Sequence, residues 1–295
     1  SNQEIRDDES RLFNVMATPG YPELIGEMIS LNNDRGLTAF IIGDSPFRLK
    51  SDGTTLNNWG NNTALAVEDN DDGLVSRDEY LGVFYPSLFT SDNAGNNVVV
   101  PPSHAIMRTF ALSDQVSFPW FAPAGTRRGG ITNASAAGFV DAEGEFKSIA
   151  LNEGQRDTLY SLNINPITFL TGAGLVNFGQ KTRARNASAL DRINVARLVI
   201  YLRSQLKKLA KPYIFEPNDK ITRDEIKAQV DSLMLELVSQ RALYDFLVVC
   251  DESNNTPSRI DRNELYVDIA IEPVKAVEFI YIPLRLKNTG EIAGL

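Results

Sequence analysis

The sequence has 295 residues, of which 43% are hydrophobic and 23% charged, and its formal net charge is −9. These values are typical of a folded globular protein with one large domain or two ordinary ones. The net negative charge gives no reason to expect a direct nucleic-acid partner. One cysteine, Cys250, and one histidine, His104, exclude an intrachain disulfide and metal sites built from several Cys or His ligands. No apolar run reaches the roughly 18 residues of a membrane span, so we expect no membrane insertion.

The first portion, residues 1–145, alternates apolar segments with helical patterns. Pro22 suits the first turn of a helix, because its missing N–H is not needed there, and a proline pair opens another helix at 101–103. Residues 45–79 form a polar, loop-rich insertion. The order strand, helix, strand occurs twice and favours an α/β layer with parallel neighbours. The expected strands cover 12–17, 37–42, 80–89 and 118–122, and a short helix is considered at 63–67.

The second portion, residues 146–295, contains two long helices and several strands. The first long helix is expected at 188–210, and the second begins with a capping box made by Thr222 and Glu225. A dense apolar run at 246–250 is interpreted as a central strand. Apolar and polar residues alternate at 265–272 and again at 280–286, which is the period of half-buried strands.

These patterns together predict a fold class. We expect an α/β protein with a mixed β-sheet flanked by helices. Its C-terminal α+β portion would contain the two long helices and antiparallel strands, and residues 287–295 would project as an arm.

Positive charge is concentrated in residues 181–211, which hold nine basic residues and one acid, Asp191. At 100° per residue the basic side chains fall on one half of the helix and the leucines on the other. Solvated helix faces usually mix both signs of charge, so we favour an acidic partner over an ordinary solvated face. Nucleic acid is disfavoured because no aromatic platform accompanies the charges. The basic positions are Arg192, Arg197, Arg203, Lys207, Lys208 and Lys211.

The acidic loop at 68–79 partly fits the pattern of a calcium-binding loop. Glu68, Asn70, Asp72 and Glu79 occupy positions 1, 3, 5 and 12 of that pattern. Position 1 is usually Asp, however, and the segment that follows reads as a strand instead of an exiting helix. A solvated acidic loop is therefore the preferred interpretation, and a calcium-dependent binding module remains the alternative.

Motifs for other chemistry are incomplete. The glycines near 172–179 lack the third glycine of a dinucleotide fingerprint, since position 177 is asparagine. No Gly-x-Ser-x-Gly elbow marks a hydrolase. We therefore expect no cofactor, and an α/β enzyme is the least favoured reading.

A series of short motifs resembles the tail sheath proteins of contractile phage tails and related injection machines. The resemblance covers residues 80–286, and the order and spacing of the motifs carry it. They are Tyr85-Pro86, Pro101-Pro102-Ser103, Ala111-Leu112-Ser113-Asp114, Trp120-Phe121-Ala122-Pro123-Ala124-Gly125, Leu162-Asn163-Ile164-Asn165-Pro166-Ile167, Gly179-Gln180-Lys181-Thr182-Arg183, Phe215-Glu216-Pro217-Asn218-Asp219, Val249-Cys250-Asp251 and Glu278-Phe279-Ile280.

The resemblance implies a structural subunit, not an enzyme. Such a subunit polymerises around a tail tube and contracts to drive the tube through the host envelope. The implied partners are other copies of the chain, the tail tube protein, and baseplate and tail terminator proteins. The implied location is the virion tail, after assembly in the host cytoplasm. Because members of the family usually carry further domains, and Ser1-Asn2 is typical of a tag remnant, we expect a fragment of a longer subunit.

The resemblance also gives roles to two sets of residues. The basic helix would face an acidic surface of the tube. The core sheet would be extended by arms from neighbouring subunits, which is strand addition at an open sheet edge. The residues expected in that strand and arm are Val277, Phe279, Tyr281, Leu284, Leu286 and Leu295.

Overall fold

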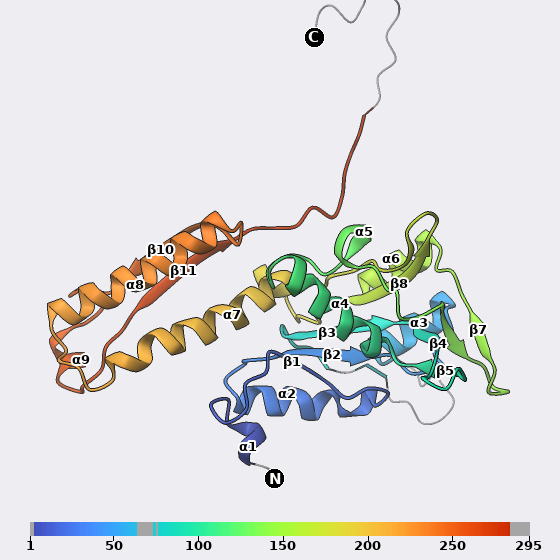
Figure 1. Ribbon diagram of the computed structural model, residues 1–295, viewed down its shortest axis with the longest axis horizontal. Helices are drawn as coiled ribbons and strands as arrows, with labels where there is room; N and C mark the ends of the chain where they lie inside the picture. The colour runs from blue at the N-terminus through green and yellow to red at the C-terminus, as the bar shows by residue number, and fades with distance from the viewer. Residues whose placement is uncertain (1–2, 64–72, 75, 284–295) are drawn as a thin grey trace, which may run out of the picture.

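The computed structural model describes residues 3–63, 73–74 and 76–283. It consists of a body built around a central sheet and a smaller lobe at the far end of the long helix α7 (Ile193–Ala210), as Figure 1 shows. From the lobe, the chain returns toward the body and then leaves it as an extended C-terminal segment. Six of the predicted site residues lie outside the described residues: Glu68, Asn70, Asp72, Leu284, Leu286 and Leu295.

The central sheet has five strands in the order β1-β2-β3-β8-β9. Its first four strands are parallel to one another, and β9 runs antiparallel to β8. The predicted mixed sheet of an α/β protein is therefore confirmed. Every residue of β2 and β3 is buried, as expected for apolar strands covered on both faces. The strands are β1 (Val15–Ala17), β2 (Phe40–Asp44), β3 (Leu81–Tyr85), β8 (Ile164–Leu170) and β9 (Gly174–Asn177).

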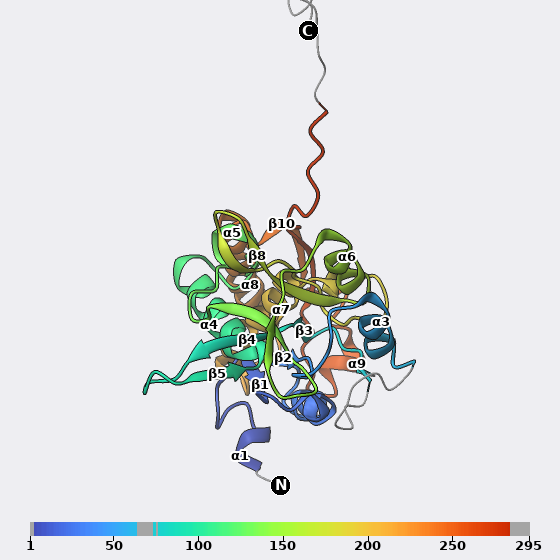
Figure 2. The same ribbon diagram turned by 90° about the vertical axis from the view of Figure 1, so that its right-hand side faces the viewer.

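Helices cover both faces of this sheet because alternate residues of each strand point to opposite sides. Phe40 and Ile42 pack with α4 and α7 on one face, and Ile41 packs with α2, α3 and α6 on the other. Viewed end-on in Figure 2, α2, α3 and α6 lie on the opposite side of the strands from α4. The helices are α2 (Ile25–Asp34), α3 (Gly53–Asn61), α4 (Pro102–Val116) and α6 (Glu153–Ser161).

A second, antiparallel sheet extends the body in the order β5-β4-β6-β7. The apolar segment expected as one strand at 80–89 is divided by a cis peptide bond between Tyr85 and Pro86. Its two halves, β3 and β4, belong to different sheets. The remaining elements of this part are β4 (Ser87–Ser91), β5 (Asn97–Val100), β6 (Ala136–Val140), β7 (Phe146–Ser148), α1 (Gln3–Arg6), η1 (Pro22–Leu24), α5 (Gly125–Arg128) and η2 (Ala189–Asp191).

The lobe is a helix packed on a two-stranded antiparallel ribbon, which confirms the predicted α+β portion. Its core joins leucines of α7 to the apolar face of α8 and to β10. Because α7 also contributes Ile193, Ala196 and Ile200 to the core of the body, one helix belongs to both parts. The elements of the lobe are η3 (Lys211–Tyr213), α8 (Lys220–Ser239), β10 (Leu243–Val249), α9 (Pro257–Ile260) and β11 (Asp268–Pro273).

Helix α8 begins differently from the prediction. Its N-cap is Asp219, whose Oδ1 accepts a hydrogen bond from the backbone N–H of Thr222 at 2.9 Å. The capping box of Thr222 and Glu225 is therefore wrong, and the helix starts one turn earlier. Aspartate is as good an N-cap residue as threonine, because its carboxylate accepts from a free backbone N–H of the first turn.

Two expected strands are also wrong. The run at 246–250 is not central, because β10 pairs only with β11 among the described residues and Leu247 is 62% exposed. Residues 118–122 form a turn, in which the rings of Phe118 and Trp120 stack at 4.7 Å. Trp120 packs edge-on against Tyr201 of α7, so this apolar side chain contacts a helix instead of forming part of a strand.

The strand expected at 280–286 forms no ladder within the described residues, and Ile280 and Ile282 are 76% and 83% exposed. The short helix considered at 63–67 lies outside the described residues from position 64 on, and α3 ends at Asn61. The division of the chain at residue 145 stays a prediction. Parallel strands β3 and β8 pair with each other across that position.

Candidate interaction surfaces

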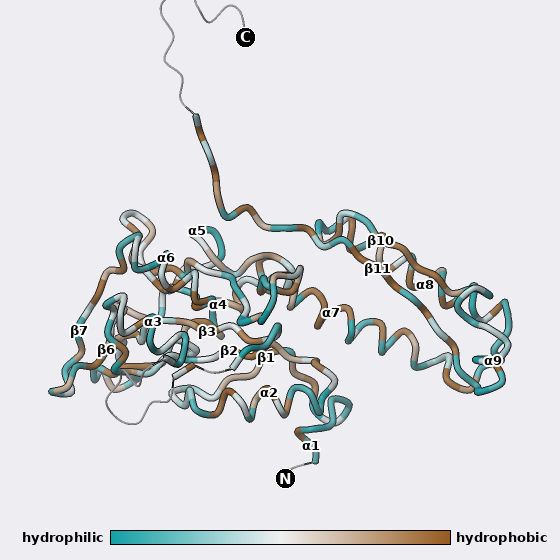
Figure 3. Tube along the Cα trace, turned by 180° about the vertical axis from the view of Figure 1, so that it is seen from behind, coloured by the Kyte–Doolittle hydropathy of each residue, from teal (hydrophilic) through white to brown (hydrophobic). Residues whose placement is uncertain are grey.

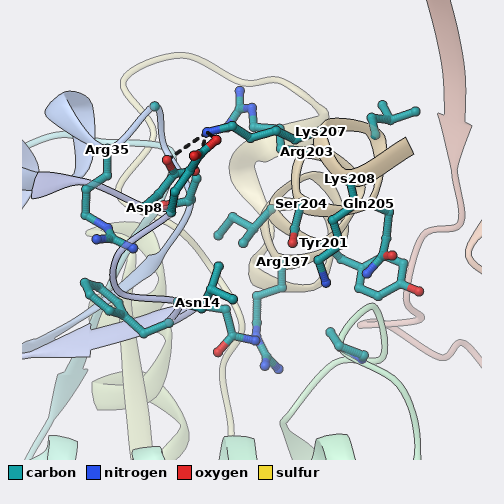
Figure 4. Close-up of a pocket in the computed structure, with 18 of the residues that line it drawn as sticks. Asp8, Asn14, Arg35, Arg197, Tyr201, Arg203, Ser204, Gln205, Lys207 and Lys208 are labelled. Atoms are coloured by element: carbon teal, nitrogen blue, oxygen red, sulfur yellow. Dashed lines mark hydrogen bonds and ion pairs between the residues drawn. The ribbon is translucent and has the colours of Figure 1, made fainter. Parts of the chain in front are cut away.

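Helix α7 lines a groove of about 830 Å³ against the N-terminal segment of the chain. Figure 4 shows this groove, with side chains of α7 on one wall and Asp8, Asn14 and Arg35 on the other. Four of the six basic residues predicted as tube-facing are labelled there, and Lys211 also lines the groove. The alternation of hydrophobic and hydrophilic bands along α7 is visible in Figure 3.

Arg197 does not belong to a solvated face. Its side chain is only 3% exposed, and its Nη2 donates to Asp114 of α4 at 2.5 Å. Its guanidinium also lies over the ring of Phe110, 4.6 Å from the centroid. Arg203 is half-buried and donates to the carbonyl of Leu37 at 3.1 Å. The expectation that all the basic residues form one exposed face is therefore wrong at these positions.

The C-terminal end of α7 is the exposed part of the basic set. Lys207 contacts Asp8 at 2.8 Å, and Lys211 approaches Glu9 at 3.5 Å. Hydrogen bonding to Asp8 raises the pKa of Lys207. Lys208 is exposed and has no acidic partner among the described residues. The positive end of α7 is therefore partly neutralised by carboxylates of the same chain.

Arg35 holds the N-terminal segment beside α7, and no local sequence pattern predicts this role. Its guanidinium donates to the carbonyls of Ile5 at 2.5 Å and Arg11 at 2.7 Å. It also lies 3.7 Å from the ring centroid of Phe13. Arg35 is 3% exposed, so the contact replaces most of its hydration. Its partners lie more than twenty residues away in the sequence.

Arg192, the sixth basic residue, points to the C-terminal segment. Its Nε and Nη2 donate to Oε1 and Oε2 of Glu278 at 2.6 and 3.0 Å. The apolar residues on either side of this anchor are the predicted arm residues Val277, Phe279 and Tyr281, which are 78%, 70% and 87% exposed. Brown segments along this extended stretch mark its hydrophobic residues in Figure 3. The structure therefore separates Arg192 from Lys207, Lys208 and Lys211, with which the sequence had grouped it.

The ribbon of the lobe has two outer edges that pair with no strand among residues 3–63, 73–74 and 76–283. Tyr244 and Leu247 of β10 are 63% and 62% exposed. A ribbon of two strands is marginal unless something packs on it, and here α8 covers one face. Its edges are therefore available for a further strand.

Of the four residues considered as calcium ligands, the structure describes Glu79, which is half-buried. Within the described residues, no group of three or more His, Cys, Asp or Glu side chains could hold a metal ion. Cys250 is buried, and burial raises the pKa of its thiol. None of the helices in the described part of the chain is long and apolar enough to cross a membrane.

Comparison with solved structures shows which proteins share the fold of this chain. A chain of the anti-feeding prophage baseplate superimposes with a TM-score of 0.70 at 20% identity, over 95% of this chain and 70% of that one. The helical sheath of the anti-feeding prophage in its contracted state gives a TM-score of 0.68 at 20% identity, over 93% and 70%. The chain therefore shares its fold with subunits of contractile assemblies.

Comparison of sequences gives a more specific similarity. Residues 186–287 match the family model described as the phage tail sheath C-terminal domain. The tail sheath protein of Vibrio phage KVP40 is 40% identical over 199 residues, which make up 66% of this chain and 28% of that protein. The resemblance to contractile tail sheath proteins is thus confirmed. The chain spans less than a third of the length of this curated relative.

Proposed function

We propose that this chain is the C-terminal part of a structural subunit of a contractile tail sheath. One observation carries the proposal: a β-ribbon that pairs with no further strand of the described residues and an extended apolar segment that leaves the body occur in the same chain. The names and folds of the relatives support it. They give no support to a calcium-binding module or an α/β enzyme.

The ribbon and the arm are complementary. The outer edges of β10 and β11 present backbone N–H and C=O groups that another strand can pair with. The described part of the arm is extended and apolar, and it makes no ladder in its own chain. An arm from a neighbouring copy can add to the ribbon, so that backbone hydrogen bonds give affinity and alternate side chains give register.

Linking through arms would allow contraction. The bodies can rotate and repack between two arrangements while the added strands keep neighbouring subunits joined. In the sheath, this motion would drive the tube through the host envelope. The partners of the chain would be other copies of itself, the tube, and the baseplate and terminator proteins at the two ends of the tail. The subunit would be assembled in the host cytoplasm and kept in the virion tail.

The arm is tested in the full-length protein that contains this chain. We expect the wild type to form hollow helical cylinders in electron micrographs. Replacing Val277, Phe279 and Tyr281 together with Asp should abolish the cylinders, because three charges cannot enter an apolar strand position without a large desolvation cost. Circular dichroism should show an unchanged fold, since the three side chains are 70–87% exposed.

The control is Tyr21→Asp, which places one such charge at an exposed aromatic position of the body. It should leave the cylinders intact. Cylinders of normal length from the triple variant would contradict strand addition by the arm. A wild-type protein that stays monomeric at all concentrations would contradict the sheath function itself.

A further inference from the structure

The C-terminal segment is fixed to the molecule at two successive points. The first follows directly on β11, where the backbone N–H of Val274 donates to the carbonyl of Ala242 at 3.0 Å. Asn194 of α7 donates its Nδ2 to the carbonyl of Val274 at 3.4 Å. This point is part of the folded lobe, because it continues the end of the ribbon.

The second point is the ion pair between Glu278 and Arg192. Two parallel hydrogen bonds of 2.6 and 3.0 Å join the carboxylate to the guanidinium, and Gln180 approaches the same carboxylate at 3.4 Å. Such bidentate pairs are stronger than single hydrogen bonds and fix the direction of both groups. The side chains are 28% and 17% exposed, so water reaches the pair from one side.

Beyond Glu278 the chain has no fixed point among the described residues. No hydrogen bond joins residues 279–283 to the rest of the structure that is described. Their apolar side chains are 70–87% exposed. Figures 1 and 2 both show this stretch leaving the body. The free arm therefore starts directly after the ion pair.

We propose that the pair of Glu278 and Arg192 is a releasable clamp that sets the free length of the arm. With the clamp closed, the arm is free from residue 279. With the clamp open, it is free from residue 275, which adds four residues and about 13 Å of reach. This inference rests on the proposed sheath function. Opening of the pair would lengthen the free arm. The added strand can then stay on a neighbour's ribbon while two bodies move apart.

The clamp is suited to opening under load. It joins side chains, so its loss leaves both ladders and both cores unchanged. Both side chains of the pair are partly exposed and regain water when it opens, which keeps the cost of opening below that of unfolding the lobe. The backbone contacts at Val274 belong to the ribbon and would hold after the pair has separated.

Trypsin tests the clamp in the isolated chain, because Lys275 lies between the two fixed points. Glu278→Gln keeps the shape of the side chain and removes its charge. We expect cleavage after Lys275 to be about tenfold faster in this variant, as measured by mass spectrometry. Free peptides spanning 270–283 with Glu or Gln at position 278 correct for any preference of the protease. Glu272→Gln, a matched change at an exposed position of β11, should cleave at the wild-type rate.

A double-mutant cycle assigns the effect to the pair. Arg192→Met should accelerate cleavage to a similar extent, and adding Glu278→Gln to it should have a much smaller effect than Glu278→Gln has alone. Equal cleavage rates in the wild type and the Glu278→Gln variant would overturn the clamp. Fully additive effects of the two substitutions would also overturn it, because the residues would then act separately.

The role in the sheath is measured in the full-length protein. Glu278→Gln cylinders should form, since the arm is intact, but contract at a lower guanidinium concentration than wild-type cylinders. Contraction at the same concentration would overturn the role of the clamp in the sheath. If trypsin confirms the clamp while the wild type forms no cylinders, the proposed sheath function fails and the clamp stands.

Discussion

The carboxylate of Asp44 joins three segments at the C-terminal end of β2. Its oxygens accept hydrogen bonds from the backbone N–H of Gly20 at 3.0 Å, and from the N–H and hydroxyl of Ser103 at 2.7 Å each. Ser103 is in the first turn of α4, where backbone N–H groups lack intrahelical partners. Because Asp44 is 2% exposed, these contacts are shielded from water. A strand residue thus caps a helix more than fifty residues away in the sequence.

Removing this cap should destabilise the protein. We expect Asp44→Ala to lower the free energy of unfolding by about 2–3 kcal/mol, because buried donors of Gly20 and Ser103 lose their acceptor. Asp52→Ala removes the cap of α3 at an exposed position and should cost only about 1 kcal/mol. Urea denaturation followed by circular dichroism measures both. Equal losses would show that burial does not set the value of the cap at Asp44.

Asp44 also makes the stability of the protein depend on pH. Burial raises the pKa of the Asp44 carboxyl, and this outweighs the hydrogen bonds that lower it. The folded state therefore holds the proton more tightly than the unfolded state, so the contribution of this group is greatest below the ordinary pKa of 3.8. It declines as pH rises toward the raised pKa. The stability advantage of the wild type over Asp44→Asn should shrink across that window, and an advantage that grows would contradict the assignment.

At the scale of elements, Arg183 connects the ends of two helices. Its guanidinium donates to the carbonyl of Leu162, which follows α6, at 2.5 Å, and to that of Leu74 at 3.2 Å. The carbonyl of Gly60 at the end of α3 lies 3.5 Å from the same group. A cation at the C-terminal ends of helices is favoured by the helix dipole. Burial lowers the pKa of Arg183 to about 9.

We expect Arg183→Met to lower the free energy of unfolding by about 2–4 kcal/mol, because buried carbonyls would lose the guanidinium that donates to them. The loss should be local. Hydrogen exchange should accelerate in α3 and at the end of α6, and stay unchanged in α8, which belongs to a separate core. Arg262→Met, at an exposed position of the lobe, is the control and should change neither. Uniform acceleration over the chain would contradict the local role.

At the scale of the whole molecule, the position of α7 decides which charges a partner can meet. We expect the exposed end of this helix, Lys207 and Lys208, to contact an acidic surface of the tail tube. Lys207→Glu with Lys208→Glu should weaken sedimentation of full-length sheath protein with tubes and reduce the dependence of that binding on salt. Arg203 is left intact, because its contacts with Leu37 and the ring of Tyr80 belong to the fold.

Lys220→Glu, on the exposed start of α8, is the control for adding negative charge elsewhere. It should leave binding to tubes unchanged. If the double variant at 207 and 208 binds tubes with the affinity and salt dependence of the wild type, the tube does not meet this end of α7. Asp8 and Glu9 already contact Lys207, so a partner at this lysine must compete with carboxylates of the chain.

The sequence by itself determined the fold class, the two long helices and the class of protein. Buried strands and amphipathic helices have local periods, and the sheath motifs keep their order along the chain. Tertiary structure decided which charges are free and which apolar segments pair. Helical periodicity places Arg197 and Arg192 on a solvated face. In the structure, Arg197 contacts Asp114 and Phe110 of α4, and Arg192 is paired with Glu278 of the C-terminal segment. The periodicity of a helix fixes the direction of each side chain, but the neighbours that neutralise or bury it come from distant parts of the chain.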